Sequence, residues 1–254
     1  MRIAKVLAVI ALACGLCALG PRWSQSPGSR TWWRPFEEYW LKFKPGMPTW
    51  GDPIEEAPVI VCGTLNGERV GEETERMAFG QPVEGYWRVM DMAVDDVIKG
   101  IDQDTKMIQV FAPTESPMEY LGSEPYYSLR ANVRYLLFLK PSGDRPGLYR
   151  LLRSREGMPP PLPLAARPPE QKEAATIRAR LIVELMATAQ QRDVELAAPA
   201  IPVLGYVGNG NPRVTRLLRK LARNRHPDLA VLAGRSLARS AGALYRPSGV
   251  KTSR

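Results

Sequence analysis

The sequence has very few of the side chains that common catalytic and metal sites require. Its single histidine, His226, excludes a histidine-based catalytic triad and a metal site built from several histidines. Of its three cysteines, Cys14 and Cys17 lie in the apolar N-terminal stretch. Only Cys62 remains for the body of the protein, so no disulfide framework is expected. Because Cys62 lies in a strand-like run, we expect it to be a small buried apolar side chain.

The sequence also lacks an N-terminal apolar run long enough to cross a membrane. Val6–Gly20 has 15 residues, whereas a membrane-spanning helix needs about 20. Because Arg2 and Lys5 precede this run, residues 1–20 are typical of an export signal. Two alternatives stay open: the segment remains attached as an N-terminal anchor, or Cys14 carries a lipid. The predicted location is exported, periplasmic or extracytoplasmic, with or without an N-terminal anchor.

Acidic and basic residues are unevenly distributed along the chain. The whole sequence has a net charge of +9. Residues 1–56 contribute +2, residues 57–153 contribute −3, and residues 154–254 contribute +10. Residues 154–169 contain six prolines, a composition typical of an extended, semi-rigid linker. These features predict two separately folding units, 57–153 and 170–245, on either side of this linker.

Residues 21–56 are rich in aromatic side chains and are expected to connect the N-terminal segment to the first folded unit. Within them, aromatic residues recur at the i, i+3, i+4 and i+7 positions of a helix. These residues are Phe36, Tyr39, Trp40 and Phe43. A helix with one aromatic face can lie among lipid headgroups at a membrane interface, or it can pack on the protein's own barrel. The sequence leaves both alternatives open.

Residues 57–153 contain short apolar runs with the features of β-strands. The predicted strands are 58–65, 84–95, 105–111, 133–140 and 147–153. Proline, glycine and aspartate between the last two, from Pro141 to Gly147, predict a turn, so these two strands are expected to form an antiparallel hairpin. The sequence therefore predicts an α+β protein: a small antiparallel five-stranded β-barrel, which removes exposed edges, followed by helices.

The order of these runs resembles that of the netrin-like, OB-type barrel of the tissue inhibitors of metalloproteinases and of a set of secreted bacterial domains. The residues that carry the resemblance are "VIVCGTL", "WRVMDMAVDDVIKG", "IQVFAP" and "VRYLLFLKPSGD". The resemblance implies a barrel of the same type. In the inhibitors, a free N-terminal cysteine within a Cys-x-Cys pair binds the zinc ion of the protease. This chain has "CGLC" inside its apolar N-terminal segment and no counterpart at the start of the barrel.

The C-terminal region has the periodicity of helices. The pattern resembles HEAT-like repeats over residues 193–241 and, less closely, over 170–192, which implies stacked helix pairs that act as a scaffold for partners. In the first helix we expect a buried apolar stripe, with Glu184 outside it. The expected stripe residues are Ile177, Leu181, Leu185 and Ala189. Residues 246–254 are expected to form a disordered basic tail.

One surface feature indicates binding. Residues 211–254 contain 11 basic residues and a single acidic residue, Asp228. One predicted helix in this region has basic residues along one side and apolar residues along the other. These basic residues are Arg213, Arg216, Lys220 and Arg223. They are expected either to bind an anionic surface such as lipid headgroups or to form a solvated outer face.

Three aspartates on one predicted strand are a weaker candidate. Asp91, Asp95 and Asp96 lie close together in the sequence, and carboxylates are the usual ligands of calcium. Because strand side chains alternate, Asp96 points away from the other two, which favours a solvated face over a calcium site. No metal and no cofactor is expected.

The sequence therefore predicts a non-enzymatic protein, exported or anchored in the cell envelope, that binds or organises a partner. The partner is expected to be an unknown protein or an anionic membrane surface, and not nucleic acid, since an export signal would separate the chain from nucleic acid. No catalytic residue is expected, because no nucleophile or acid–base pair stands out. Two alternatives stay open: a metalloprotease-inhibitor-like barrel protein and an enzyme of unrecognised type.

Overall fold

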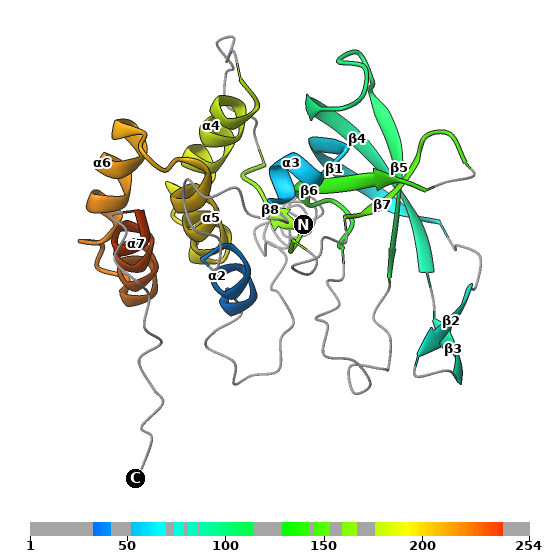
Figure 1. Cartoon of the computed structure of the whole chain (residues 1–254), viewed down its shortest axis with the longest axis horizontal. Coiled ribbons are helices and arrows are strands. Elements are labelled where there is room, and N and C mark those ends of the chain that lie inside the picture. Colours follow the sequence, from blue (N-terminus) through cyan, green and yellow to red (C-terminus); the bar gives the residue numbers. More distant parts are fainter. Residues whose placement is uncertain are drawn as a thin grey trace, which may run out of the picture. The chain divides into compact units, whose positions relative to one another are not determined.

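The computed structural model of the chain, drawn in Figure 1, describes most of the region from residue 33 to residue 240. The described residues are 33–41, 52–69, 74–78, 81–85, 87–113, 129–142, 145–152, 159–166 and 176–240. The predicted export signal and the predicted basic tail lie outside them. All the helices and strands described below belong to one compact unit, Trp33–Arg254.

Five strands form a closed β-barrel (Figure 1). They are β1 (Val59–Arg69), β4 (Trp87–Lys99), β5 (Met107–Pro113), β6 (Arg134–Pro141) and β7 (Leu148–Leu151). Around the barrel the order is β1-β4-β5-β7-β6, and β6 pairs with β1 to close the ring. A separate two-stranded sheet, β2 (Thr74–Ala78) with β3 (Gln81–Gly85), lies between β1 and β4 in the sequence. The five-stranded barrel and the α+β class are confirmed.

One pairing in the barrel is parallel, which corrects the prediction that all the strands are antiparallel. β5 and β7 run in the same direction, with Val110 opposite Tyr149, whereas the other four pairings of the ring are antiparallel. The reason is geometric, because strand directions cannot alternate at every step around a ring with an odd number of strands. A closed barrel of five strands therefore needs at least one parallel pair.

The hairpin predicted from the turn residues is confirmed. β6 and β7 pair antiparallel, with Leu139 opposite Leu151 and Pro141 opposite Tyr149. Directly before β7, Gly147 has a φ of +79°, a left-handed conformation that glycine adopts without the steric penalty of a Cβ atom. The apolar run before the turn is therefore a barrel strand.

Alternation along the strands fills the barrel with apolar side chains. On β4, Met90, Met92 and Val94 are buried in the core, and Asp91 and Ala93 between them are only partly buried. Other core members are Val59, Val61, Leu65, Ile108, Val110, Leu129, Tyr135, Leu137, Leu139 and Leu151. Burial of a large aliphatic side chain stabilises a fold by about 1.5–3 kcal/mol, so this core is a main source of the barrel's stability.

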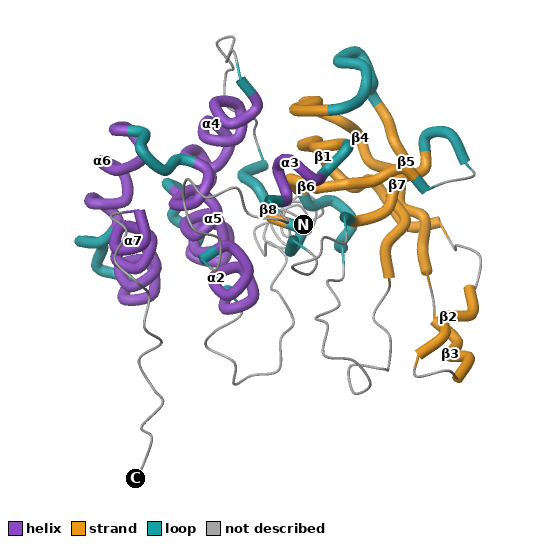
Figure 2. Tube along the Cα trace, viewed as in Figure 1, coloured by secondary structure: helices purple, strands orange, loops and turns teal. Residues whose placement is uncertain are grey.

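The helices form two packed pairs and two shorter elements (Figure 2). They are α2 (Arg34–Trp40), α3 (Pro53–Glu56), α4 (Ile177–Ala189), α5 (Val194–Val207), α6 (Pro212–Leu221) and α7 (Pro227–Ser240). α4 packs on α5, α6 packs on α7, and the two pairs meet where α5 contacts α7. The side chains of Thr176, Asp193 and Asn211 accept hydrogen bonds from backbone N–H groups at the starts of α4, α5 and α6, which explains where these helices begin.

The outer face of β1 and β6 is also buried, because other parts of the chain cover it. Ile60 and Cys62 on β1 alternate with core residues, as do Leu136 and Phe138 on β6, and all four are at most 3% exposed. Phe138 lies against Trp40 of α2, with ring centroids 5.5 Å apart. Cys62 is thus a small buried side chain, as expected. The barrel and the helices share this second apolar layer.

Part of the proline-rich segment belongs to the sheet. Residues 159–165 are buried, and β8 (Leu162–Pro163) pairs antiparallel with β6, with Leu136 opposite Leu162. Proline is tolerated here because β8 lies at an edge, where a missing N–H group leaves no neighbouring strand unpaired. α5 also contacts β8, so this stretch packs between the barrel and the helices.

α5 and α7 approach each other closely at a glycine. A Cβ atom added at Gly205 of α5 would lie 2.7 Å from the Cβ atom of Ser236 on α7, which is closer than two carbon atoms can pack. Ser236 is buried, and its hydroxyl donates to the carbonyl oxygen of Ile201, 3.5 Å away. A Cβ atom added at Gly234 of α7 would instead meet no atom within 4 Å.

Replacing Gly205 or Gly234 with alanine should therefore have opposite effects on the stability of the fold. Gly205→Ala pushes α5 and α7 apart and should lower the free energy of unfolding by about 1–3 kcal/mol, the usual result of overpacking. Gly234→Ala should raise it by up to about 1 kcal/mol, because alanine favours the helix more than glycine does. Urea unfolding of both variants measures the difference. Equal stability of the two variants would contradict the close approach of α5 and α7.

Candidate functional site

A buried arginine joins the barrel to the helices. Arg134, at the start of β6, is 3% exposed, and Glu184 of α4 is fully buried. Their side chains form a bidentate ion pair, with Nη1 2.8 Å from Oε2 and Nη2 2.9 Å from Oε1. The Nε of Arg134 also donates to the carboxylate of Asp95 on β4, 2.6 Å away. Arg134 therefore connects two barrel strands with a helix.

The burial of Glu184 corrects the expectation that it lies outside the apolar stripe of its helix. Leu181 and Leu185, its neighbours in the stripe, are fully buried as expected. Glu184 lies among them because Arg134 gives its carboxylate two charged hydrogen bonds, which offset the loss of water. This partner is distant in the sequence, so the periodicity of the helix gives no sign of it.

The surroundings shift the pKa values of Arg134 and Cys62. Burial by itself lowers the pKa of Arg134, but the hydrogen bonds to Glu184 and Asp95 and the nearby negative charges together outweigh burial, and the pKa is raised above its ordinary value. Nearby, burial and the negative charge of Glu184 raise the pKa of the Cys62 thiol well above its usual range. A thiol that stays protonated is a poor nucleophile. The network is therefore suited to holding the fold together and not to covalent chemistry.

Two further arginines of α4 bind carboxylates outside their own helix. Arg180 pairs with Asp96 of β4, and Arg178 pairs with Asp52, the residue before α3, at 3.0 Å. The guanidinium of Arg178 also lies 5.7 Å from the ring centroid of Tyr206 on α5. Burial, followed by the hydrogen bond and charge of Asp52, raises the pKa of the Tyr206 hydroxyl. These contacts make α4 the main ionic link between the helices and the rest of the fold.

The three aspartates of β4 have protein partners. Asp95 and Asp96 bind the arginines named above, and Asp91 accepts a hydrogen bond from the side-chain amide of Gln109, 3.2 Å away. Among the residues that the structure describes, no group of three or more histidine, cysteine, aspartate or glutamate side chains could hold a metal ion. The aspartates of this strand serve ionic and polar contacts within the protein.

The structure buries aromatic side chains that were candidates for membrane contact. Phe36, Tyr39 and Trp40 are at most 6% exposed. Trp40 lies against Tyr206 of α5, with ring centroids 5.5 Å apart. α2 therefore packs on α5 and, through Trp40 against Phe138, on the barrel strand β6. Phe43 lies outside the described residues.

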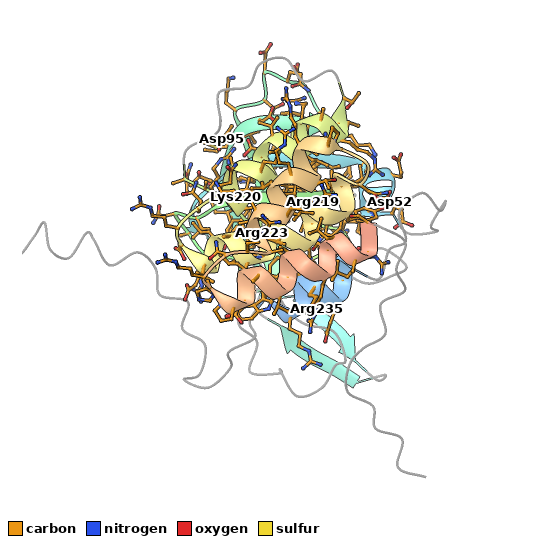
Figure 3. All side chains as sticks on the ribbon, turned by 90° about the vertical axis from the view of Figure 1, so that its left-hand side faces the viewer. Asp52, Asp95, Arg219, Lys220, Arg223 and Arg235 are labelled. Carbon is orange, nitrogen blue, oxygen red and sulfur yellow. The ribbon has the colours of Figure 1, made fainter. Side chains whose placement is uncertain are left out.

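The exposed side of α6 and of the turn that follows it is rich in basic side chains, and Figure 3 labels Arg219, Lys220 and Arg223 among them. The apolar side of the helix is buried as predicted, through Val214, Leu217, Leu218 and Leu221. We use the term α6 basic face for the exposed basic residues Arg213, Arg216, Arg219, Lys220 and Arg223. Four of the five are predicted from the sequence. Arg219 is missed, although it lies three residues from Arg216 and four from Arg223, a spacing that places it on the same face.

Like charges are neighbours throughout the α6 basic face. Residues three or four apart on a helix are adjacent, and each pair of like charges at this spacing destabilises a helix by about 0.2–0.5 kcal/mol. The pairs within α6 are Arg213–Arg216, Arg216–Arg219 and Arg216–Lys220. Arg223, in the turn after α6, lies four residues from Arg219 and three from Lys220. The acidic residue nearest in sequence, Asp228, lies instead 3.7 Å from Nδ1 of His226. Within the described part of the chain, no side chain of the face forms an ion pair or a hydrogen bond.

Known proteins provide no assignment for this chain. No protein-family model matches it, and no curated protein matches it. None of the described helices is both long and apolar enough to span a membrane. The function must therefore be argued from the residues themselves.

Removing one partner of the Arg134–Glu184 pair should destabilise the fold more than removing both. Arg134→Met leaves the Glu184 carboxylate buried without its partner and should lower the free energy of unfolding by about 3–5 kcal/mol. Adding Glu184→Met removes that charge and should restore most of the loss. Urea unfolding of the two single variants and the double variant measures the coupling. If the double variant loses the sum of the unfolding free energies lost in the two single variants, the two residues do not form a shared buried pair.

Proposed function

We propose that this protein is a non-enzymatic binding protein, exported or anchored in the cell envelope, whose α6 basic face docks on an anionic membrane surface. One observation carries the proposal: α6 and the turn after it present five exposed basic side chains that form no ion pair or hydrogen bond in the described part of the chain. Three other arginines of the helical region are paired. Arg178 and Arg180 bind aspartates, and Arg235 of α7 binds Glu37 of α2 at 2.5 Å.

Repulsion within the α6 basic face supports a binding role. A solvated helix is best stabilised by charges of both signs at adjacent positions, and solubility alone does not require charges of one sign. An anionic surface would neutralise the face and so remove the repulsion that destabilises the free helix. Relief of this repulsion would favour the bound state. Figure 3 looks onto this side of the helical region and labels Arg219, Lys220 and Arg223 on it.

Binding of this kind would be electrostatic, without insertion of α6 into the bilayer. An interfacial helix inserts by burying its apolar side among the acyl chains. In α6 that side already packs on the protein, and Val214 and Leu218 are 1% exposed. Attraction to an anionic surface contributes about 1 kcal/mol per basic side chain. Five such side chains therefore suffice for reversible binding at low ionic strength.

The rest of the fold is consistent with a scaffold. We infer that the barrel is of the netrin-like, OB-type class and that the helix pairs are HEAT-like. A five-stranded barrel closed by β1 and β6 supports the first inference. The contact of the α4–α5 pair with the α6–α7 pair supports the second. In this proposal the N-terminal segment brings the chain to the membrane, and the remaining surfaces are left for an unidentified protein partner.

Reversing charges on the α6 basic face should weaken membrane binding and stabilise the fold. We expect Arg216→Glu with Lys220→Glu to reduce binding to anionic vesicles by orders of magnitude at low ionic strength, since about 1 kcal/mol per basic side chain is lost and repulsion is added. The same change makes the pairs of residue 216 with Arg213 and Arg219 attractive, whereas residues 216 and 220 still repel each other as two glutamates. The net effect should raise the free energy of unfolding by about 1 kcal/mol. Co-sedimentation and urea unfolding measure the two effects on the chain that begins at Pro21, which lacks the apolar N-terminal run.

The matched control reverses the charge of two exposed arginines elsewhere in the protein, Arg150 on β7 and Arg192 before α5. Arg150→Glu with Arg192→Glu changes the net charge equally and should keep most of the vesicle binding. Binding of the unmodified protein should fade as salt shortens the screening length from about 10 Å at 0.1 M to about 3 Å at 1 M. Equal binding to anionic and neutral vesicles, or equal losses in the two double variants, would show that the α6 basic face is only a solvated surface.

A further inference from the structure

We propose that four residues of the α6 basic face select phosphate monoesters on the anionic surface. The four are Arg216, Arg219, Lys220 and Arg223, and we call them the α6 cation cluster. This inference rests on the proposed function and adds the chemical class of the headgroup that the same site recognises.

Helix geometry and the turn after α6 bring these four cations around one point. Each residue advances about 100° around the helix and about 1.5 Å along it, so Arg216, Arg219 and Lys220 of α6 lie within an arc of about 100°. Arg223 lies two residues after the end of α6. Because Ala222 keeps right-handed helical dihedrals, with φ −64° and ψ −14°, Arg223 continues the turn and lies next to Arg219 and Lys220. The four Cα positions thus approximate the corners of a diamond. Arg213 lies one turn before it, next to Arg216 alone.

The side chains of the α6 cation cluster are free to turn toward a ligand at the centre of this diamond. All four are exposed, and in the described part of the chain they form neither ion pairs nor hydrogen bonds. The buried side of the helix, with Leu217 and Leu221, fixes its rotation. The Cα positions of the diamond are therefore fixed and face solvent, while its side chains can turn toward a ligand.

A phosphate monoester matches this arrangement better than a diester does. A terminal phosphate carries a charge of about −1.5 to −2 near pH 7 and three strong acceptor oxygens. A diester carries a single charge and offers fewer free oxygens. Three of the four cations are arginines, whose planar guanidinium groups bind phosphate oxygens in bidentate fashion. The cluster thus has more hydrogen-bond donors and more positive charge than a diester can pair with, and a monoester pairs with more of them.

The test compares vesicles of equal surface charge, one set with phosphatidic acid, a monoester, and one with phosphatidylglycerol, a diester. Electrophoretic mobility of the vesicles confirms that the charges match. The chain that begins at Pro21, which contains the complete compact unit, should bind the monoester vesicles about tenfold more tightly, the effect of one extra hydrogen bond to a charged group. Arg219→Gln with Arg223→Gln should abolish this preference. Arg213→Gln with Arg225→Gln removes the same charge outside the cluster and should weaken binding to both vesicles while keeping the preference.

Each outcome decides between the two proposals. No binding to either vesicle would overturn the proposed function and this inference together. Equal binding to both vesicles, or an equal loss of preference in the two glutamine variants, would overturn only the selection of monoesters. Inorganic phosphate at constant ionic strength should not displace the protein from monoester vesicles, because the surface also attracts Arg213. Displacement would identify free phosphate as the ligand and overturn recognition of a lipid headgroup.

Discussion

The pairing of Arg134 with Glu184 is the constraint on which the arrangement of this protein depends. A buried carboxylate is unstable without a partner, so Glu184 can lie in the apolar stripe of α4 only while β6 lies against it. β6 in turn buries the outward-facing Leu136 and Phe138, which water would reach if the helices moved away. The ion pair and the apolar layer favour the same arrangement, in which the barrel and the helices share one core.

This arrangement also accounts for part of the uneven charge along the chain. Residues 57–153 carry a net charge of −3 and residues 154–254 carry +10, and the two regions meet through pairs such as Asp96 with Arg180. Asp96 of the barrel thus neutralises Arg180 of α4. α6 contacts the other long helices, and its exposed side meets no described carboxylate. Its positive charge is therefore not neutralised within the described part of the chain, which is why the proposed site lies on α6 and not on α4.

Features set by local periodicity could be predicted from the sequence, and features set by distant partners could not. Alternation along 90–94 and the turn residues after Pro141 indicate the strands of the barrel, and the amphipathic pattern of α6 indicates both its buried side and its basic side. The parallel β5–β7 pair follows from closing a ring of five strands, which no single strand reveals. The burial of Glu184 needs an arginine from β6, and the burial of Trp40 needs Phe138 and Tyr206. These contacts join segments that are far apart in the sequence.

Native-state hydrogen exchange, followed as a function of urea, tests most directly whether the barrel and the helices unfold as one cooperative unit. If they do, the slowest amides of β1 and β4 and those of α5 should exchange with the same opening free energy and the same dependence on urea. The reason is that loss of the helices would expose Phe138 and leave Arg134 without Glu184. Amides of β1 and β4 that stay protected at urea concentrations where α5 exchanges freely would show that the barrel is stable by itself, and would contradict the shared core.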